Sequence, residues 1–91
     1  MKEDILQIGR NDINIESKAL SLLKDNIGDA FVKTVELLSE TKGKVIVIGI
    51  GKSGRIAEKM VSTLCSTGTP AVFLHASEAM HGDLGIYNAG D

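Results

Sequence analysis

Apolar residues recur at helical spacing through the first part of the chain. Between Ile5 and Leu23 they fall largely at helical spacings, with charged and polar residues between them; they are Ile5, Ile8, Ile15, Ala19, Leu22 and Leu23. This periodicity predicts one long amphipathic helix. Gly9 and the pair Asn11-Asp12 weaken the pattern near its start, where the glycine alone costs about 1 kcal/mol, so the helix can break there.

A second helix is predicted after a polar stretch at residues 25–29. Phe31, Val35 and Leu38 fall on one stripe of this helix, and Gly43 stands just beyond its expected end. We therefore expect Gly43 to close the helix as a left-handed cap. Residues 1–43 thus form a helical segment.

After this segment the pattern changes from helical spacing to continuous apolar runs. Residues 45–48 have the composition of a strand buried on both faces of a parallel sheet. Residues 53–64 are amphipathic again, and residues 71–74 form a second apolar run. The order of strand, glycine turn, helix, turn and strand predicts a right-handed βαβ unit. The fold class is therefore α/β, with amino-terminal helices followed by the start of a parallel sheet.

Composition narrows the functional classes. The chain of 91 residues is short enough for one domain, and its 43% hydrophobic and 24% charged residues are those of an ordinary globular protein. A net charge of -2 and an aromatic content of 3% argue against binding to nucleic acid. The single Cys65 and the acidic amino terminus favour a cytoplasmic protein, and the longest apolar stretch, residues 45–50, is too short for a membrane span.

The segment after the first predicted strand is the first candidate for ligand binding. In Gly49-Ile50-Gly51-Lys52-Ser53-Gly54 the glycines let the backbone turn tightly at the carboxyl end of a parallel strand, where open sheets bind ligands. The helix start offers free N–H donors, Lys52 adds a positive charge, and Ser53 can serve as the N-cap or as a hydroxyl donor. These features favour an anionic ligand.

Several interpretations of this segment remain open. The spacing of Gly49, Gly51 and Gly54 matches the dinucleotide fingerprint, but no acid ends the second strand to hold a ribose. Lys52 and Ser53 match the end of a nucleotide P-loop, whose first glycine would fall on Ile46. A sugar-phosphate site is the third alternative. A purely structural turn would use the same glycines, and we weight it equally with a ligand loop.

The segment after the second predicted strand holds both histidines of the chain, His75 and His81. An isolated histidine is more often an ordinary hydrogen-bonded residue than a base or a ligand, but the carboxyl end of a strand favours a function. Two histidines six positions apart without a third donor are poor evidence for zinc. For Glu78 and Asp83, helix capping or simple solvation is the preferred interpretation.

Three motifs along the chain stand in register with those of a known family. They are Gly-Ile-Gly-Lys-Ser-Gly-Arg-Ile-Ala, Ser-Thr-Gly-Thr-Pro-Ala and His-Ala-Ser-Glu-Ala-Met-His-Gly-Asp-Leu-Gly. Together they closely resemble the arabinose 5-phosphate isomerases, which are sugar isomerase (SIS) domain proteins. The resemblance implies that residues 1–91 are the amino-terminal portion of one SIS domain, a Rossmann-like or flavodoxin-like three-layer fold of which residues 44–91 start the parallel sheet.

The resemblance also implies an activity and roles for individual residues. The family interconverts D-arabinose 5-phosphate and D-ribulose 5-phosphate by proton transfer through an enediol, in the synthesis of lipopolysaccharide sugars, and no cofactor is required. Lys52 and His81 are the implied catalytic residues. His75 matches a position linked to metal binding, so zinc at His75 is a further expectation. The expected substrate contacts are Gly51, Ser53, Gly68, Thr69, His75 and His81.

The sequence stops before the later acids and the serine-rich phosphate loop that the family uses. We therefore expect little activity from this chain alone. A non-catalytic sugar-phosphate binding or assembly module is the alternative function. Since a two-stranded sheet leaves hydrogen-bonding edges and apolar helix faces unburied, a homo-oligomer, either a dimer or a tetramer, is expected, with the long first helix at the interface.

Overall fold

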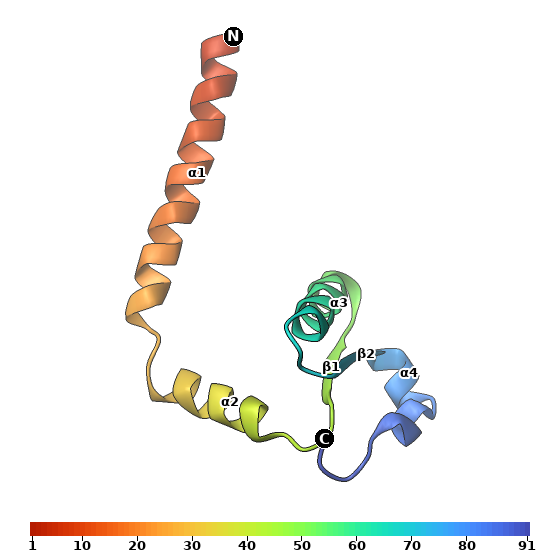
Figure 1. The fold of residues 1–91 in the computed structure, drawn as a ribbon. Coiled ribbons are helices and arrows are strands. Elements are labelled where there is room, and N and C mark those ends of the chain that lie inside the picture. Colours follow the sequence, from red (N-terminus) through yellow and green to blue (C-terminus); the bar gives the residue numbers. More distant parts are fainter. The chain divides into compact units, whose positions relative to one another are not determined.

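The computed structural model describes the backbone of the chain and the side chains of residues 1–82 and 85–91. The residues fall into two compact units, Met1–Glu36 and Leu37–Asp91, and each is described by itself. The first unit holds α1 (Lys2–Asp25) and most of α2 (Asp29–Glu40) (Figure 1). The capping interpretation of Asp83 concerns a side chain that lies outside the described residues.

The first predicted helix is confirmed as α1, which runs unbroken from Lys2 to Asp25. The break that Gly9 permits does not occur, because one glycine costs too little to interrupt a helix of 24 residues. The helix ends where the N–H of Asn26 donates to the carbonyl of Leu23 (2.9 Å). No residue of α1 is buried, so its apolar stripe has no packing partner within its own unit.

The second predicted helix is confirmed as α2, but the role expected for Gly43 is wrong. Gly43 is not among the residues with positive φ, so it does not form a left-handed cap. Its N–H donates instead to the carbonyl of Gly90 (3.0 Å), and a Cβ at this position would collide with the carboxylate of Asp91. The glycine is required here by the close approach of the final residues of the chain.

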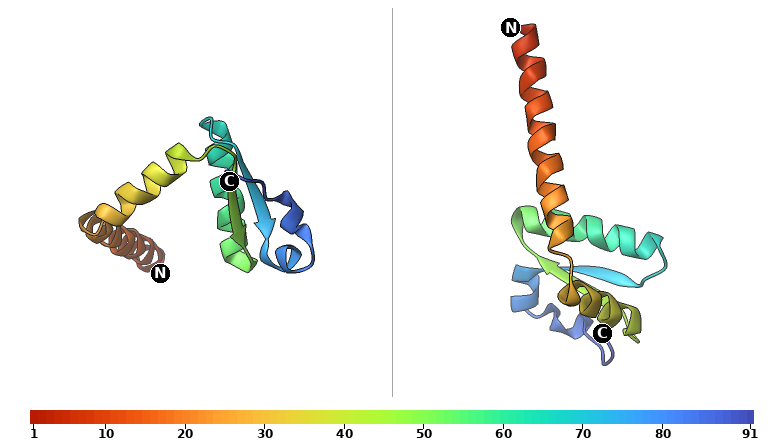
Figure 2. Two further views of the ribbon diagram at one scale, coloured as in Figure 1. Left: turned by 90° about the horizontal axis from the view of Figure 1, so that it is seen from below. Right: turned by 90° about the vertical axis from the view of Figure 1, so that its left-hand side faces the viewer.

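The predicted βαβ order is present in the second unit as β1 (Val45–Gly49), α3 (Gly51–Ser66) and β2 (Ala71–His75). The two strands pair in parallel, with Val45 opposite Ala71 and Gly49 opposite His75. Helix α3 packs along both strands, as both views of Figure 2 show. The α/β class is therefore confirmed, and this chain contributes two strands to the sheet.

The core of this unit lies between α3 and the sheet and consists of small and aliphatic residues. Ala57, Ala71 and Leu74 are its buried hydrophobic side chains. The prediction that the first strand is buried on both faces is wrong for the chain as described, since Ile48 is 47% exposed and the other residues of β1 are only half-buried. Two strands and one packed helix cannot enclose both faces of a sheet.

Two short helices follow β2. They are α4 (Ala76–Met80) and a 3-10 helix, η1 (Asp83–Ile86). The last residue then returns to the start of β1, where the Asp91 carboxylate accepts hydrogen bonds from the Lys44 N–H (2.9 Å) and the Lys44 ammonium (2.8 Å). None of the helices in the described part of the chain combines the length and apolar character needed to cross a bilayer.

Candidate functional site

The two segments singled out by the sequence meet at one edge of the sheet. Because β1 and β2 are parallel and Gly49 pairs with His75, both strands end side by side. The turn into α3 and the start of α4 therefore follow from neighbouring strand ends. This is the edge at which open parallel sheets bind ligands.

The turn from β1 into α3 depends on two properties of glycine. Gly51 has φ of +59°, a left-handed conformation that other residues rarely adopt. A Cβ on Gly49 would lie 2.9 Å from the Cα of Gly54, so the strand and the helix approach too closely for a side chain. Both requirements are structural, which agrees with the interpretation of this segment as a structural turn. Both also leave the backbone accessible beside the end of β1.

Helix α3 begins earlier than its sequence pattern suggested. Its N-cap is Ile50, which makes no side-chain capping hydrogen bond, and Ser53 already lies inside the first turn. The interpretation of Ser53 as an N-cap is therefore wrong, because the left-handed Gly51 starts the helix without a polar cap. Ser53 remains exposed at this end of the helix.

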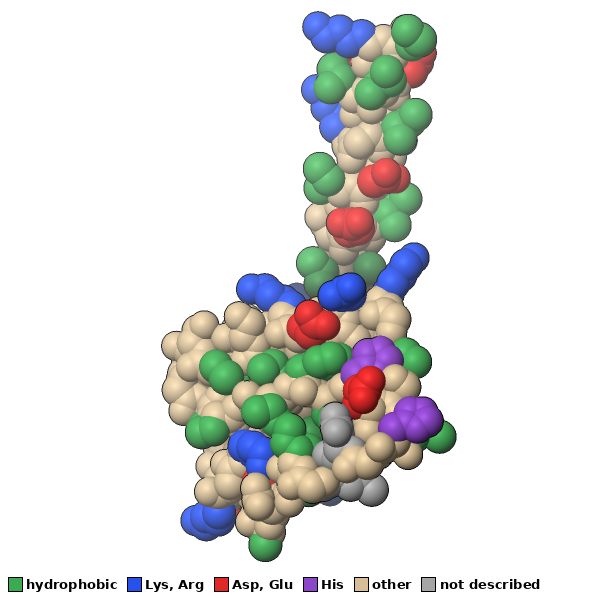
Figure 3. Space-filling model, turned by 90° about the vertical axis from the view of Figure 1, so that its right-hand side faces the viewer, with side chains coloured by type: hydrophobic (Ala, Val, Ile, Leu, Met, Phe, Trp, Pro, Cys, Tyr) green, Lys and Arg blue, Asp and Glu red, His purple; other side chains and the backbone are tan. Residues whose placement is uncertain are grey.

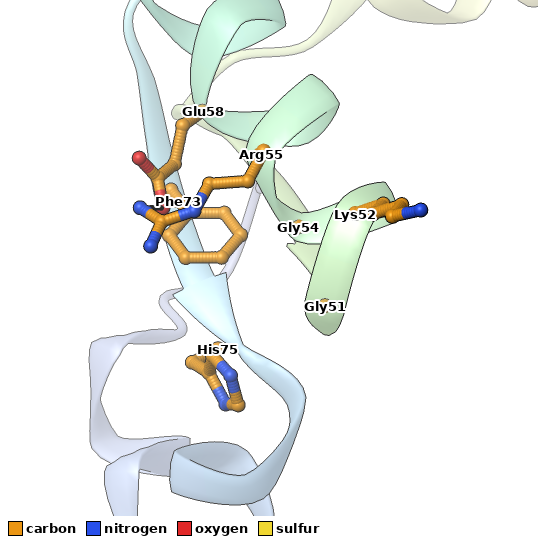
Figure 4. A pocket seen from close by; sticks show the side chains of 7 residues that line it. All are labelled: Gly51, Lys52, Gly54, Arg55, Glu58, Phe73 and His75. Carbon is orange, nitrogen blue, oxygen red and sulfur yellow. Dashed lines mark ion pairs between the residues drawn. The ribbon is translucent and has the colours of Figure 1, made fainter.

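A cavity of about 440 Å³ opens between the start of α3 and the end of β2 (Figure 4). Its volume falls within the usual range of small-molecule sites, roughly 300–1,000 Å³. It is lined by Gly51, Lys52, Gly54, Arg55, Glu58, Phe73 and His75. Of the predicted site residues, the structure thus brings Gly51, Lys52 and His75 together.

The charged side chains around this cavity favour an anion only modestly. Lys52 and Arg55 supply two cations and Glu58 one carboxylate. The Arg55 guanidinium pairs with the Glu58 carboxylate at 3.6 Å, but both side chains are largely exposed, so this pair is weak. Lys52 extends away from Phe73 and His75 (Figure 4), and its long flexible stem must turn for the ammonium to reach a ligand near His75.

His75 is the most firmly held polar side chain of the cavity. Its Nδ1 lies 3.2 Å from the backbone nitrogen of Ser77 and 2.8 Å from the Ser77 hydroxyl oxygen. Its ring stands edge-on to Phe73, with ring centroids 6.4 Å apart and an interplanar angle of 90°. Two neighbours thus restrict this imidazole, which is half-buried.

His81 does not line this cavity. It is the C-cap residue of α4, where its N–H donates to the carbonyl of Glu78 (3.1 Å), and its side chain is exposed. Both histidines reach the surface on the face shown in Figure 3. Glu78 is exposed in the first turn of α4, in agreement with its interpretation as a solvated residue.

Gly68 and Thr69 lie at the opposite end of the sheet. They precede β2, whereas His75 ends it, and five residues of strand separate the two ends by about 15 Å. Gly68 and Thr69 line another cavity, of about 210 Å³, together with Gly43 and Pro70. The structure therefore does not bring them together with Lys52 and His75, and their role as substrate contacts stays a prediction.

The described residues do not by themselves assemble a zinc site, and the zinc expected at His75 stays a prediction. Zinc in proteins is held by at least three side-chain donors, and no group of three His, Cys, Asp or Glu residues is assembled in the part of the chain with described side chains. The Nδ1 of His75 is also engaged by Ser77.

Three lining residues were missed by the sequence analysis, although the sequence holds a signal for each. Arg55 lies three positions after Lys52 and Glu58 three positions after Arg55, which places them along one side of α3. Phe73 lies two positions before His75 and so shares its face of β2. Helical periodicity counted from Lys52 and strand periodicity counted from His75 therefore identify all three residues.

Comparisons with known proteins connect this geometry with one enzyme family. No family model matches the chain. The arabinose 5-phosphate isomerase GutQ of Escherichia coli strain K12 is 46% identical over 91 residues, which are 100% of this chain and 28% of that protein. The arabinose 5-phosphate isomerase KdsD of Pseudomonas aeruginosa is 46% identical over 88 residues, 97% of this chain and 27% of that protein.

A solved structure of similar sequence has the same fold. The E. coli CFT073 protein c3406, in complex with arabinose 5-phosphate, superimposes with a TM-score of 0.91 and 38% sequence identity, covering 100% of this chain and 48% of that one. The chain spans about a quarter of the length of the curated relatives that it matches. The similarity therefore concerns their amino-terminal part.

Proposed function

Over its whole length the chain corresponds to the amino-terminal part of the arabinose 5-phosphate isomerases, and from this premise we propose that it forms the first part of a sugar-phosphate aldose-ketose isomerase. The proposed reaction interconverts D-arabinose 5-phosphate and D-ribulose 5-phosphate. The supporting observation is the cavity at the carboxyl ends of β1 and β2, in a fold that matches a complex with arabinose 5-phosphate at a TM-score of 0.91.

The chemistry of this reaction suits the residues of the cavity. An aldose-ketose isomerase opens the sugar ring, removes a proton from the carbon beside the carbonyl, stabilises the enediolate and returns the proton to the neighbouring carbon. Lys52, turned into the cavity, neutralises charge on the enediolate oxygens. His75 contacts a substrate oxygen. His81 is the second proposed catalytic residue, although it does not line the cavity.

A base for the carbon-bound proton is the part that this cavity lacks. Glu58 is the one carboxylate in its lining, and it lies about half exposed in a weak ion pair with Arg55. We therefore propose that the 91-residue chain is inactive alone and that groups outside it complete the site. A homo-oligomer, a dimer or a tetramer, is part of this proposal, because α1 has no buried residue against which its apolar stripe packs.

A non-catalytic sugar-phosphate binding or assembly module is the alternative. The same cavity favours this alternative, because its cations and its histidine can bind a sugar phosphate. Its one carboxylate, Glu58, forms an ion pair with Arg55. Binding of the sugar phosphate without turnover, in a version of the protein that spans the length of its relatives, distinguishes this alternative from an isomerase.

The experiment that tests the proposal is a chimera in which this chain replaces the matching 28% of E. coli GutQ. We expect the folded chimera to convert D-arabinose 5-phosphate, and Lys52→Ala to reduce its turnover by at least about a hundredfold, the low end for removal of a group that stabilises transition-state charge. Lys59→Ala, which changes an exposed lysine of α3 outside the cavity, should keep the rate. A folded chimera without turnover, or a fully active Lys52→Ala variant, contradicts the proposal.

A further inference from the structure

The hydrogen bonds between Ser77 and His75 determine which ring nitrogen carries the proton. The backbone N–H of Ser77 lies 3.2 Å from Nδ1 of His75. A backbone N–H can only donate, so Nδ1 must accept and carries no proton. The Ser77 hydroxyl, whose oxygen is 2.8 Å from the same nitrogen, then donates to it as well.

We infer that Ser77 is a positioning residue that holds the imidazole of His75 as the Nε2–H tautomer, so that His75 presents a hydrogen-bond donor to a ligand in the cavity. A neutral imidazole has a single N–H, and with Nδ1 bare that proton is on Nε2. Nε2 has no hydrogen-bond partner among the side chains that the structure describes. The edge-on contact with Phe73 restricts the ring plane in addition.

This assignment specifies the part of a ligand that His75 recognises, and it rests on the proposed function. An Nε2–H donor pairs with an acceptor oxygen, which in a sugar phosphate is a carbonyl, hydroxyl or phosphate oxygen. A neutral imidazole in this role polarises a carbonyl oxygen and does not remove a proton from carbon. Metal binding through Nε2 would require the proton to move to Nδ1, against the Ser77 N–H.

Long-range proton–nitrogen NMR correlation on the chain reads the tautomer directly at about pH 9, where imidazoles are neutral. We expect His75 to show a protonated Nε2 and a bare Nδ1. His81, whose exposed ring has no hydrogen bond among the described residues, is the internal reference and should show averaged tautomers. A protonated Nδ1 at His75, or the same averaging as at His81, overturns the inference.

Variants of Ser77 test whether its hydroxyl causes this preference. Ser77→Ala keeps the backbone N–H, which still favours a bare Nδ1, but removes the hydroxyl, so the nitrogen shifts of His75 should move part of the way toward the averaged values. Ser77→Thr keeps a hydroxyl and should restore the wild-type shifts. Ser66→Ala is the matched control, because its hydroxyl donates only to the carbonyl of Ser62 within α3. Unchanged shifts in Ser77→Ala contradict a positioning role for the hydroxyl.

Titration with D-arabinose 5-phosphate separates this inference from the proposed function. In Ser77→Ala we expect binding to weaken about fivefold, the size of one ordinary hydrogen bond, and Ser77→Thr to bind like the wild type. Equal affinity of all three overturns the role of Ser77 and leaves the sugar-phosphate site standing. Absence of binding to the wild type contradicts the proposed function, while the NMR tautomer still decides the role of Ser77.

Discussion

At the scale of single residues, glycines decide how the strand and the helix of the site meet. A methyl group on Gly49 would lie 2.9 Å from the Cα of Gly54, and this neighbour is backbone and cannot rotate away. We expect Gly49→Ala to destabilise the chain by about 1–3 kcal/mol, the usual range for overpacking. Urea unfolding of both proteins measures the difference.

Gly9→Ala is the control for this prediction. Gly9 lies in the interior of α1 with no heavy atom within 4 Å of an added Cβ. The substitution should therefore raise helix stability by about 0.5–1 kcal/mol, visible as higher helical content in circular dichroism on heating. An unchanged stability of Gly49→Ala, or a destabilised Gly9→Ala, would contradict the packing described for these positions.

A second residue-scale prediction concerns pH. The hydrogen bonds from the Lys44 ammonium, the Lys44 N–H and the Asn88 N–H lower the pKa of the Asp91 carboxyl from 3.8 to about 2. A lowered folded-state pKa means that the stabilisation is present above the ordinary value and is lost as the pH falls through about 2. As the pH falls from the ordinary carboxyl pKa toward about 2, we expect the free energy of unfolding of the wild type to fall. The free energy of unfolding of Asp91→Asn should fall less over the same window.

The measurement for this prediction is chemical unfolding at several pH values between about 5 and 2, a window set by the ordinary carboxyl pKa and the lowered one. Asp25→Asn is a suitable control, because Asp25 is an exposed residue at the end of α1. Parallel curves for the wild type and Asp91→Asn would show that Asp91 does not hold the start of β1.

At the scale of elements, periodicity predicted the helices and strands well. α1, α2, β1, α3 and β2 all appear near their expected positions, because each has a clear apolar spacing of its own. The ends of elements were less predictable. Gly43 is not a cap because α2 already ends at Glu40. It lies instead against Asp91, 48 positions away, a contact that local spacing cannot reveal.

The candidate site was predictable only in part. Glycine spacing and strand order placed Gly51, Lys52 and His75 at one edge of the sheet, and the structure confirms their proximity. The hydroxyl of Ser77 on Nδ1 of His75 depends on the short helix α4, whose sequence has too few residues for a helical period. His75 and Ser77 are only two positions apart, and their contact forms because His75 is the N-cap of a helix that begins at Ala76.

At the scale of the whole molecule, the exposed apolar residues predict association. On one side of α1, Ile5, Ile8, Ile15 and Leu22 are 62–67% exposed. Monomeric proteins rarely leave large apolar patches open to water. We expect light scattering at micromolar concentration to show a dimer or a larger species, and Leu22→Lys to shift it toward the monomer. A monomeric wild type would contradict the proposed oligomer.

The central claim is that the cavity at the carboxyl ends of β1 and β2 receives the sugar phosphate. The most direct measurement is an NMR titration of the labelled chain with D-arabinose 5-phosphate, with inorganic phosphate and NAD as comparison ligands. We expect shifts at the amides of Gly51, Lys52 and Gly54 and at the His75 ring, which all line the cavity. Shifts confined to Gly68 and Thr69, or a stronger response to NAD, would contradict it.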